Sequence, residues 1–519
     1  MKQELKHKIG QMIVAGFPSP VLDDQARRLV EDFEVGNFAY FARNIVNSRQ
    51  TNQLCRDLTD LVYAKTGMAP LICTDQEGGV VSRVNRGAAL VPGTMAMAAS
   101  ASCDAYLAGK TLGTVVSALG VNTTFGPVLD VNLDPMNPII GSRSFSDDTE
   151  VVTRLGLDML RGLRDGGMPA TLKHFPGHGN VSTDSHLGVP HNPCSREVLE
   201  RVEWLPFRKA FEDGAEALMT CHVVFDQVDP DHPATLSHKI MTEILRDDMH
   251  FEGIAVTDCM EMDAIKVAYG IGPGAVMAIE AGCDMLCFSH TYEAVAEAAK
   301  AIYEAVESGR ITEERIDLSY NRIVAVKKKF NLMTPPPIHE EEAMRLMYDP
   351  EMMAQNRKMS RDSMTLVYDK GGIAALKNAK RPAFFAPPSV ALTGAEDKEK
   401  APTYFSDIAA ERLGGKGIVI PLDELDEATM KAIHDPDYDV AVLGLYNARF
   451  RKGQQAVIKE MEKLERPLIV VMLGAPYDAP LIQNADALIA AYEYTSLSAE
   501  TTVDALQECV FPGKLPVKI

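Results

Sequence analysis

Eight short apolar runs, separated by stretches long enough to hold a helix, constrain the fold of the first part of the chain. Parallel strands need crossover connections of a dozen or more residues, usually helices. Eight such strand–helix units predict a (β/α)8 barrel with insertions, although the pattern alone also fits a doubly wound parallel sheet. The eight runs are 11–16, 35–41, 70–74, 121–125, 169–172, 217–221, 253–257 and 284–288.

The polar residues that follow these runs favour the barrel. Asp75 follows the third run, Lys173 and His174 the fifth, His222 the sixth and Asp258 the seventh. Strands buried in a parallel sheet are apolar, so ionisable groups at successive carboxyl ends indicate one shared polar mouth. In a barrel these ends meet on the catalytic face, where we expect the active site.

A boundary is expected near residues 335–360. A helix predicted to begin after Thr312 ends in three lysines, and three consecutive prolines follow at 335–337, which cannot continue a helix. We therefore expect a catalytic barrel over 1–334, a linker over 335–360 and a smaller, mostly parallel α/β sandwich domain over 361–519. The strands expected in the second domain are 364–368, 389–392, 417–420, 440–445, 468–473 and 487–491.

Composition excludes several classes of partner and cofactor. The 72 acidic and 52 basic residues give a net charge of −20, which disfavours nucleic acid and anionic membrane surfaces. The nine cysteines form no CxxC pair, and no run reaches the ~18 apolar residues of a membrane helix. The first residues lack a signal-peptide pattern. No dinucleotide or Walker motif stands in a usable context. We expect a soluble, cytoplasmic protein without a cofactor.

The segment 173–186 carries the densest chemistry. It holds Lys173, His174, His178, Asp184 and His186 among glycines and a proline, so we expect a loop that leaves the fifth strand. One interpretation is a metal site formed by the three histidines. The other is a proton-transfer pair, in which Asp184 orients His186 beside a substrate-holding Lys173 and His174. A lysine next to a metal ligand is electrostatically unfavourable, so we favour proton transfer and expect no metal.

Four further residues are candidates for the same mouth. Asp258 closes the seventh strand, where a carboxylate serves as a nucleophile, a base or a helix N-cap. Asp75 precedes a pair of glycines that let the backbone turn close to a ligand. Arg83 lies eight positions further on, and Arg143 stands in the sequence Gly-Ser-Arg-Ser-Phe. Arg83 could reach the same pocket as Asp75, whereas an arginine such as Arg143 is on its own more often a solvated surface residue.

The histidine loop, with its sequence KHFPGHG followed by DSH, resembles the signature of glycoside hydrolase family 3. More narrowly, it is similar to the β-N-acetylglucosaminidase branch that recycles bacterial cell-wall fragments. Small departures are Cys259-Met260 after Asp258, and Val189 where the branch usually has leucine. The similarity covers about residues 1–330, and the further matching segments are 41–45, 75–79, 127–130, 138–145, 233–237 and 257–258.

The resemblance implies a retaining mechanism with a covalent glycosyl-enzyme. Asp258 would be the nucleophile, and His186, oriented by Asp184, would be the general acid and then the base, in place of the usual second carboxylate. By the same resemblance, the residues placed around the terminal sugar are Asp75, Arg83, Arg143, Lys173 and His174.

The expected activity is exo-hydrolysis of terminal β-linked N-acetylglucosamine from muropeptides or chitooligosaccharides. The alternatives are a family 3 β-glucosidase, an N-acetylglucosaminide phosphorylase that releases sugar 1-phosphate, and a non-catalytic glycan-binding protein. The sequence leaves open the oligomeric state and the role of the second domain.

Overall fold

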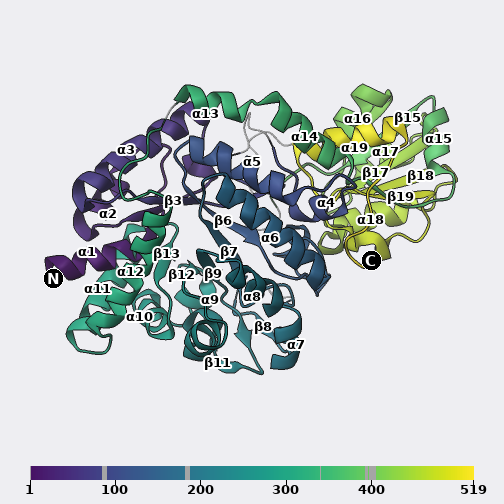
Figure 1. The fold of residues 1–519 in the computed structure, drawn as a ribbon. Coiled ribbons are helices and arrows are strands. Elements are labelled where there is room, and N and C mark those ends of the chain that lie inside the picture. Colours follow the sequence, from purple (N-terminus) through teal and green to yellow (C-terminus); the bar gives the residue numbers. More distant parts are fainter. Residues whose placement is uncertain (1, 85–89, 182–187, 339, 392–395, 397–404) are drawn as a thin grey trace.

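The computed structural model describes residues 2–84, 90–181, 188–338, 340–391, 396 and 405–519. Its first part is a closed barrel of eight parallel strands, so the barrel predicted from the apolar runs is confirmed (Figure 1). Around the barrel the strand order is β1-β13-β12-β9-β7-β6-β3-β2. The barrel strands are β1 (Ile13–Ala15), β2 (Asn37–Tyr40), β3 (Leu71–Thr74), β6 (Thr123–Val128), β7 (Ala170–Phe175), β9 (Ala217–Thr220), β12 (Ile254–Cys259) and β13 (Met285–Phe288).

Helices surround the barrel and bury their apolar faces against it, in one continuous hydrophobic core (Figure 1). The predicted cap at Thr312 is present: its side chain accepts a hydrogen bond from the Arg315 N–H, and the helix then runs to Lys329. No helix among the described residues is long and apolar enough to cross a membrane. The outer helices are α1 (Gln3–Gln11), α2 (Asp24–Phe33), α3 (Ser48–Thr66), α5 (Ala105–Ala118), α6 (Thr149–Asp165), α7 (Arg196–Arg201), α8 (Trp204–Glu212), α9 (Asp263–Lys266), α10 (Ile271–Ala281), α11 (Tyr292–Glu307), α12 (Glu313–Lys329) and the π-helical segment Lys239–Asp248.

Short insertions follow the carboxyl ends of three barrel strands and build up the mouth. After β3 the chain forms an antiparallel hairpin of β4 (Gln76–Gly78) and β5 (Val81–Ser82). A small three-stranded sheet is formed after β7 and β9 by β8 (His191–Asn192), β10 (Val224–Phe225) and β11 (Asp229–Pro233). None of these five strands was predicted: four of them have only two or three residues, and β11 consists of polar residues and prolines and not of an apolar run.

The second part of the chain is a six-stranded sheet in which only β14 runs antiparallel to its neighbour. It is therefore the mostly parallel α/β layer that the sequence predicts. Alternate residues of its strands point into two separate cores, one on each face. The strands, in spatial order, are β14 (Thr365–Asp369), β19 (Ala487–Ala490), β18 (Leu468–Met472), β17 (Val440–Leu445), β15 (Pro382–Ala386) and β16 (Lys416–Val419).

One predicted strand of this sheet was wrong. Residues 389–391 are not in a strand, and 392 lies outside the described residues; the strand is Pro382–Ala386 instead. Proline at the first position of a strand is tolerated, because only its own missing N–H is lost to the ladder. The prolines at 382, 387 and 388 hid this short buried strand from the pattern.

Helices α13 (Glu340–Met347) and α14 (Pro350–Arg361) connect the two parts, and they pass over the upper side of the barrel in Figure 1. α13 packs on α3 and α5, whereas α14 packs on α19 (Ser496–Glu508) of the second part. The second sheet is also covered by α15 (Gly372–Asn378), α16 (Phe405–Leu413), α17 (Glu427–Ile433) and α18 (Lys452–Met461).

Candidate active site

The carboxyl ends of the barrel strands open into a cavity of about 430 Å³. Ligand pockets commonly measure about 300–1,000 Å³, so this cavity has room for a sugar ring. Two of the eight residues proposed from the sequence, Asp184 and His186, lie outside the described residues. The other six all line the cavity: Asp75, Arg83, Arg143, Lys173, His174 and Asp258.

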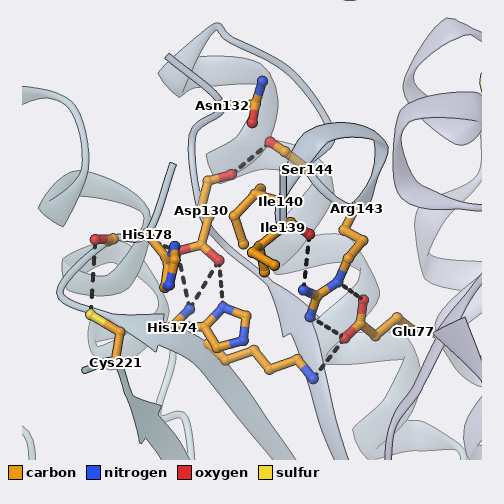
Figure 2. Close-up of polar contacts among 12 residues, drawn as sticks. Glu77, Asp130, Asn132, Ile139, Ile140, Arg143, Ser144, His174, His178 and Cys221 are labelled. Carbon is orange, nitrogen blue, oxygen red and sulfur yellow. Dashed lines mark hydrogen bonds and ion pairs between the residues drawn. The ribbon is translucent and has the colours of Figure 1, made fainter. Parts of the chain in front are cut away.

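One side of the cavity is formed by Asp75, Glu77, Arg83, Arg143 and Lys173, here termed the charged wall. The Lys173 ammonium lies 2.8 Å from Asp75 Oδ1 and 2.7 Å from Glu77 Oε1. The Arg83 Nη2 group donates to Asp75 Oδ2 at 3.1 Å. Arg143 grips Glu77 with two hydrogen bonds, of 2.9 Å and 2.7 Å, and the two side chains face each other in Figure 2.

The charged wall is assembled by the β4–β5 hairpin. Gly78 and Gly79 turn the chain with φ angles of 95° and 59°, a region that glycine enters without steric cost. The turn holds Glu77 opposite Arg143, which lies in the 3₁₀ turn Gly141–Arg143. Lys173 reaches both carboxylates from β7, and its side chain is only 2% exposed.

The cations of this wall keep both of its carboxylates ionised. Burial alone would raise the pKa of Asp75, but Lys173 and Arg83 outweigh it and hold that pKa well below its usual range. Burial likewise acts against Glu77, and Arg143 and Lys173 bring its pKa down to about 2. Three cations thus face two carboxylates in a shielded site, and the wall presents both donors and acceptors to a polyhydroxylated ligand.

The other side of the cavity is built around Asp130. Asp130, His174 and His178 are together termed the histidine wall. Asp130 Oδ2 lies 2.7 Å from His174 Nδ1, and Oδ1 accepts the His178 N–H at 2.7 Å. The His174 N–H also points at this carboxylate, at 3.2 Å from each oxygen. Figure 2 shows Asp130 between the two histidines. The wall fixes the start of the histidine loop to the barrel.

The protonation of this wall follows from its contacts. Burial opposes the charge of Asp130, yet His174 and the other donors lower its pKa, so the carboxylate is ionised. An ionised carboxylate only accepts hydrogen bonds, which places the proton of His174 on Nδ1. Burial and the neighbouring His174 lower the pKa of His178 to about 4, so His178 is neutral near pH 7.

Asp258 stands next to last in β12 and lines the same cavity as both walls. Its Oδ1 accepts the Cys259 N–H at 2.7 Å, a bond that orients the carboxylate at the strand end. His222 supports this turn from behind: its ring nitrogens lie 2.8 Å from Thr235 Oγ1 and 3.1 Å from the Cys259 carbonyl oxygen. The polar residue predicted after the sixth strand therefore supports the strand end of Asp258.

Sequence reasoning missed Glu77 as a member of the site. Glu77 stands two positions after Asp75, in a stretch already singled out for its glycines. A second carboxylate in so short a segment signals a nearby cation, because a buried charge is rarely left unpaired. Its partners were not visible, since Arg143 lies 66 residues further along the chain.

The alternative that we did not favour, a metal site of three histidines, lies only partly within the described residues. The rings of His174 and His178 lie with their centroids 5.7 Å apart, and His186 is outside the described ranges. Within the part of the chain that the structure describes, no group of three or more His, Cys, Asp or Glu side chains is arranged to hold a metal ion.

Comparison with known sequences places this site in a family. The model of the glycosyl hydrolase family 3 N-terminal domain matches residues 4–326, which is more than half of the chain and includes every barrel strand. A β-hexosaminidase from Alkalilimnicola ehrlichii is 36% identical over 290 residues, or 54% of this chain and 82% of that protein. β-Hexosaminidase A from Pseudoalteromonas piscicida is 30% identical over 332 residues, and the match covers 59% of this chain and 56% of that protein's length.

Solved structures extend the likeness to the second sheet. A glycoside hydrolase family 3 β-N-acetylglucosaminidase from Paenibacillus sp. strain FPU-7 superposes with a TM-score of 0.93 at 35% identity, covering 99% of this chain and 98% of that one. The barrel, the charged mouth and these matches lead to one conclusion: the chain belongs to glycosyl hydrolase family 3.

Proposed function

We propose that the protein is a retaining exo-β-N-acetylglucosaminidase that acts through a covalent glycosyl-enzyme. The observation that carries the proposal is the placement of Asp258 in one sugar-sized cavity with both walls. A carboxylate at a barrel strand end, beside a dense set of hydroxyl-binding groups, suits attack on an anomeric carbon. The β-hexosaminidases and the β-N-acetylglucosaminidase among its relatives support the choice of sugar.

In the first step an Asp258 oxygen bonds to the anomeric carbon and the bond to the leaving oxygen breaks. His186, oriented by Asp184, gives its proton to that leaving oxygen. In the second step His186 takes a proton from water, whose oxygen bonds to the same carbon and releases the Asp258 carboxylate. The roles of Asp184 and His186 rest on the family resemblance of the loop sequence, and imidazole suits them because its pKa lies near working pH.

The two walls would hold the sugar in this scheme. Lys173 and the two arginines donate to hydroxyl oxygens, while Asp75 and Glu77 accept from hydroxyl groups. His174 lines the same cavity with its Nδ1 proton committed to Asp130, so the ring is held in one orientation beside the sugar. Interactions that strengthen as positive charge develops on the sugar contribute to rate as well as to binding.

Muropeptides or chitooligosaccharides are the proposed natural substrates, and the cytoplasm is the proposed compartment. The nine cysteines are all free, which suits a reducing environment. A terminal N-acetylglucosamine is common to both substrate classes. Comparing the two as substrates therefore decides between them without affecting the sugar assignment.

The test is an assay of aryl β-N-acetylglucosaminide and aryl β-glucoside with the wild type, Asp258→Asn and a matched control, Asp213→Asn. Asp213 lies in the turn before β9, at the end of the barrel opposite the cavity, and pairs there with Arg161 of α6. We expect cleavage of the acetamido sugar and a loss of at least about 10³-fold for Asp258→Asn alone. Nuclear magnetic resonance should show the β-anomer as the first product, because two displacements retain configuration.

Other outcomes assign the function differently. If Asp258→Asn keeps near-normal turnover, or the α-anomer forms first, the nucleophile and the retaining mechanism are wrong. Faster cleavage of the glucoside would identify a β-glucosidase. Release of sugar 1-phosphate only when phosphate is added would identify a phosphorylase, and binding without cleavage would identify a glycan-binding protein.

A further inference from the structure

The helix α4 (Thr94–Ala99) is one of the places where the barrel part meets the second part of the chain. It belongs to the first part of the chain and follows the β4–β5 hairpin in the sequence. Its residues Met95, Ala96 and Ala99 nevertheless pack into the core on one face of the second sheet. Both parts of the chain therefore hold this helix, and any residue bonded to its start is placed by both.

Glu493 of the second part is bonded to the start of this helix. It follows β19, is 2% exposed, and its Oε2 accepts the Gly93 N–H at 2.7 Å. The approach needs glycine on the barrel side. A β-carbon on Gly79 would collide with Glu493 Oε2, and one on Gly93 would lie 2.7 Å from the same oxygen. The Glu493 carboxylate thus packs directly against the turn that carries Glu77.

Thr94, the residue after Gly93, links this contact to Arg143. The Thr94 hydroxyl donates to the Arg143 carbonyl oxygen at 2.6 Å. Glu493, Glu77 and Arg143 line a residual cavity of only about 10 Å³, so little space separates the second domain from the back of the charged wall. The ion pair of Arg143 and Glu77 then faces the active-site cavity on its other side.

A second contact between the two parts reaches the 3₁₀ turn of Arg143 from its other end. The Asn132 side chain donates to the Tyr477 hydroxyl at 2.9 Å, and its Oδ1 accepts the Gly141 N–H at 3.1 Å. Gly141 begins the 3₁₀ turn that ends at Arg143. The second part of the chain is therefore linked to this turn from two sides, by Glu493 through Gly93 and Thr94 and by Tyr477 through Asn132.

Burial raises the pKa of Glu493 to about 7, although Gly93 and Thr495 donate to its carboxylate. A carboxylate buried among neutral donors is not a stabilising choice for an interface.

We propose that Glu493 is a positioning residue, through which the second domain sets the place of the Arg143–Glu77 pair in the sugar pocket. The proposal rests on the proposed function, because it assigns the charged wall to sugar binding. It gives the second domain a part in substrate recognition without a contact to the sugar.

The test compares Glu493→Ala with Glu493→Gln, which keeps an oxygen for the Gly93 N–H. The matched control is Asp147→Ala, because Asp147 also accepts a backbone N–H from the second part, that of Lys518 at 3.0 Å, but is only partly buried and does not line the cavity. We expect Glu493→Ala to lower kcat/KM at least about tenfold, mainly through KM, since small misplacements of binding groups are costly. Glu493→Gln and Asp147→Ala should stay within about twofold.

A double-mutant cycle separates positioning from a general structural effect. In an Arg143→Ala background, Glu493→Ala should cost less than about twofold more, because the group it positions is gone. If the two losses multiply, or if Glu493→Ala lowers only the Tm, the proposal is overturned. Should Glu493→Ala not yield folded protein, Thr94→Val interrupts the same path at the Arg143 carbonyl. It is expected to raise KM, and an unchanged KM would overturn the proposal.

Calorimetric binding of N-acetylglucosamine keeps this proposal apart from the proposed function. If the wild type binds the sugar but does not cleave aryl glycosides, the proposed function fails while the effect of Glu493→Ala on Kd is still measured. An unchanged Kd in that case overturns the positioning role. If the wild type cleaves the substrate and Glu493→Ala changes neither Kd nor KM, only the positioning role fails.

Discussion

The two walls of the cavity hold their buried carboxylates by different means. In the charged wall, Asp75 and Glu77 face full cations at 2.7–3.1 Å. In the histidine wall, Asp130 is held by two backbone N–H groups and one imidazole. The first arrangement balances charge, whereas the second fixes the direction of the groups around it.

This difference determines how a substitution in each wall should affect stability and activity. Removing a cation from the charged wall leaves carboxylates buried without compensation, and such a change costs more than the pair contributed. Removing the charge of Asp130 takes away the acceptor that fixes two backbone N–H groups and one imidazole, and the loss is mainly one of orientation. Substitutions in the charged wall should therefore reduce both stability and activity, whereas those in the histidine wall should act mostly on activity.

Of the changes that test this difference between the walls, Lys173→Met should lower stability and activity the most. It leaves Asp75 and Glu77 without the cation they share, and we expect the free energy of unfolding to fall by about 3–5 kcal/mol. Activity should fall at least about 100-fold, from the loss of charge-assisted hydrogen bonds. Urea unfolding and kcat/KM measure the two effects. The control is Lys329→Met, which removes an ion pair to Glu216 at the amino end of β9. Equal losses in both variants would mean that the wall has no special role.

Asp130→Asn should separate orientation from stability. The amide replaces one of the two carboxylate oxygens with an NH2 donor, so either His174 Nδ1 or the His178 N–H loses its acceptor. We expect kcat/KM to fall about 10- to 100-fold, the worth of one charge-assisted hydrogen bond, while the urea midpoint moves less than for Lys173→Met. A loss of stability as large as that of Lys173→Met would remove the distinction between the walls.

Glu203 offers a third arrangement, in which the hydrogen bonds to a buried carboxylate come from neutral donors. It lies behind the histidine loop, where a β-carbon on Gly177 would meet it at 2.8 Å, and the Asn192 amide donates to it at 2.8 Å. Burial raises its pKa from 4.5 to about 8. The folded state then binds the proton of Glu203 more tightly than the unfolded state does. The contribution of Glu203 to the stability of the fold is therefore fully present below about pH 4.5 and is lost as the pH rises towards 8.

Glu203→Gln tests this sign. The variant should unfold with a flatter dependence of Tm on pH between 4.5 and 8, because the titrating group is gone. The expected gain in stability over the wild type is therefore largest at pH 8. A wild-type Tm that rises with pH across this window, and does so equally in the variant, would show that Glu203 is ionised in the folded protein.

Treatment with a strong chelator should change activity the least. If both walls act through protonation and charge alone, activity after dialysis against the chelator should change by less than about twofold. Loss of activity that returns when Zn²⁺ is added would support the metal interpretation of the histidine loop, and the histidine wall would then need a different account.

The barrel and most of its polar mouth were predictable because both are local properties of the sequence. Each buried parallel strand is a continuous apolar run, and the ionisable residues directly after such runs, such as Asp75 and Lys173, must meet at one end of the barrel. The error at 389–392 has the same origin. Phe384 and Phe385 form the centre of a buried strand, but prolines flank that strand and interrupt the pattern.

The pairings within the site were not predictable, because they join residues far apart in the chain. Asp130 and His174 are 44 positions apart, and Gly93 and Glu493 are 400 positions apart. The sequence shows that each of these groups is present, and only the fold decides which donor meets which acceptor. The proton-transfer pair, Asp184 with His186, remains a prediction from the loop sequence.

The packing of α4 has a consequence for how the chain is divided. Met95, Ala96 and Ala99 complete a hydrophobic core whose other buried residues all come after position 380. A cut within 335–360 would split the polypeptide but leave that core shared between the two fragments. A fragment ending at 334 would expose these three side chains to water, and one beginning at 361 would have a hole in one face of its sheet. We therefore expect each fragment to be less stable than the same part of the intact chain.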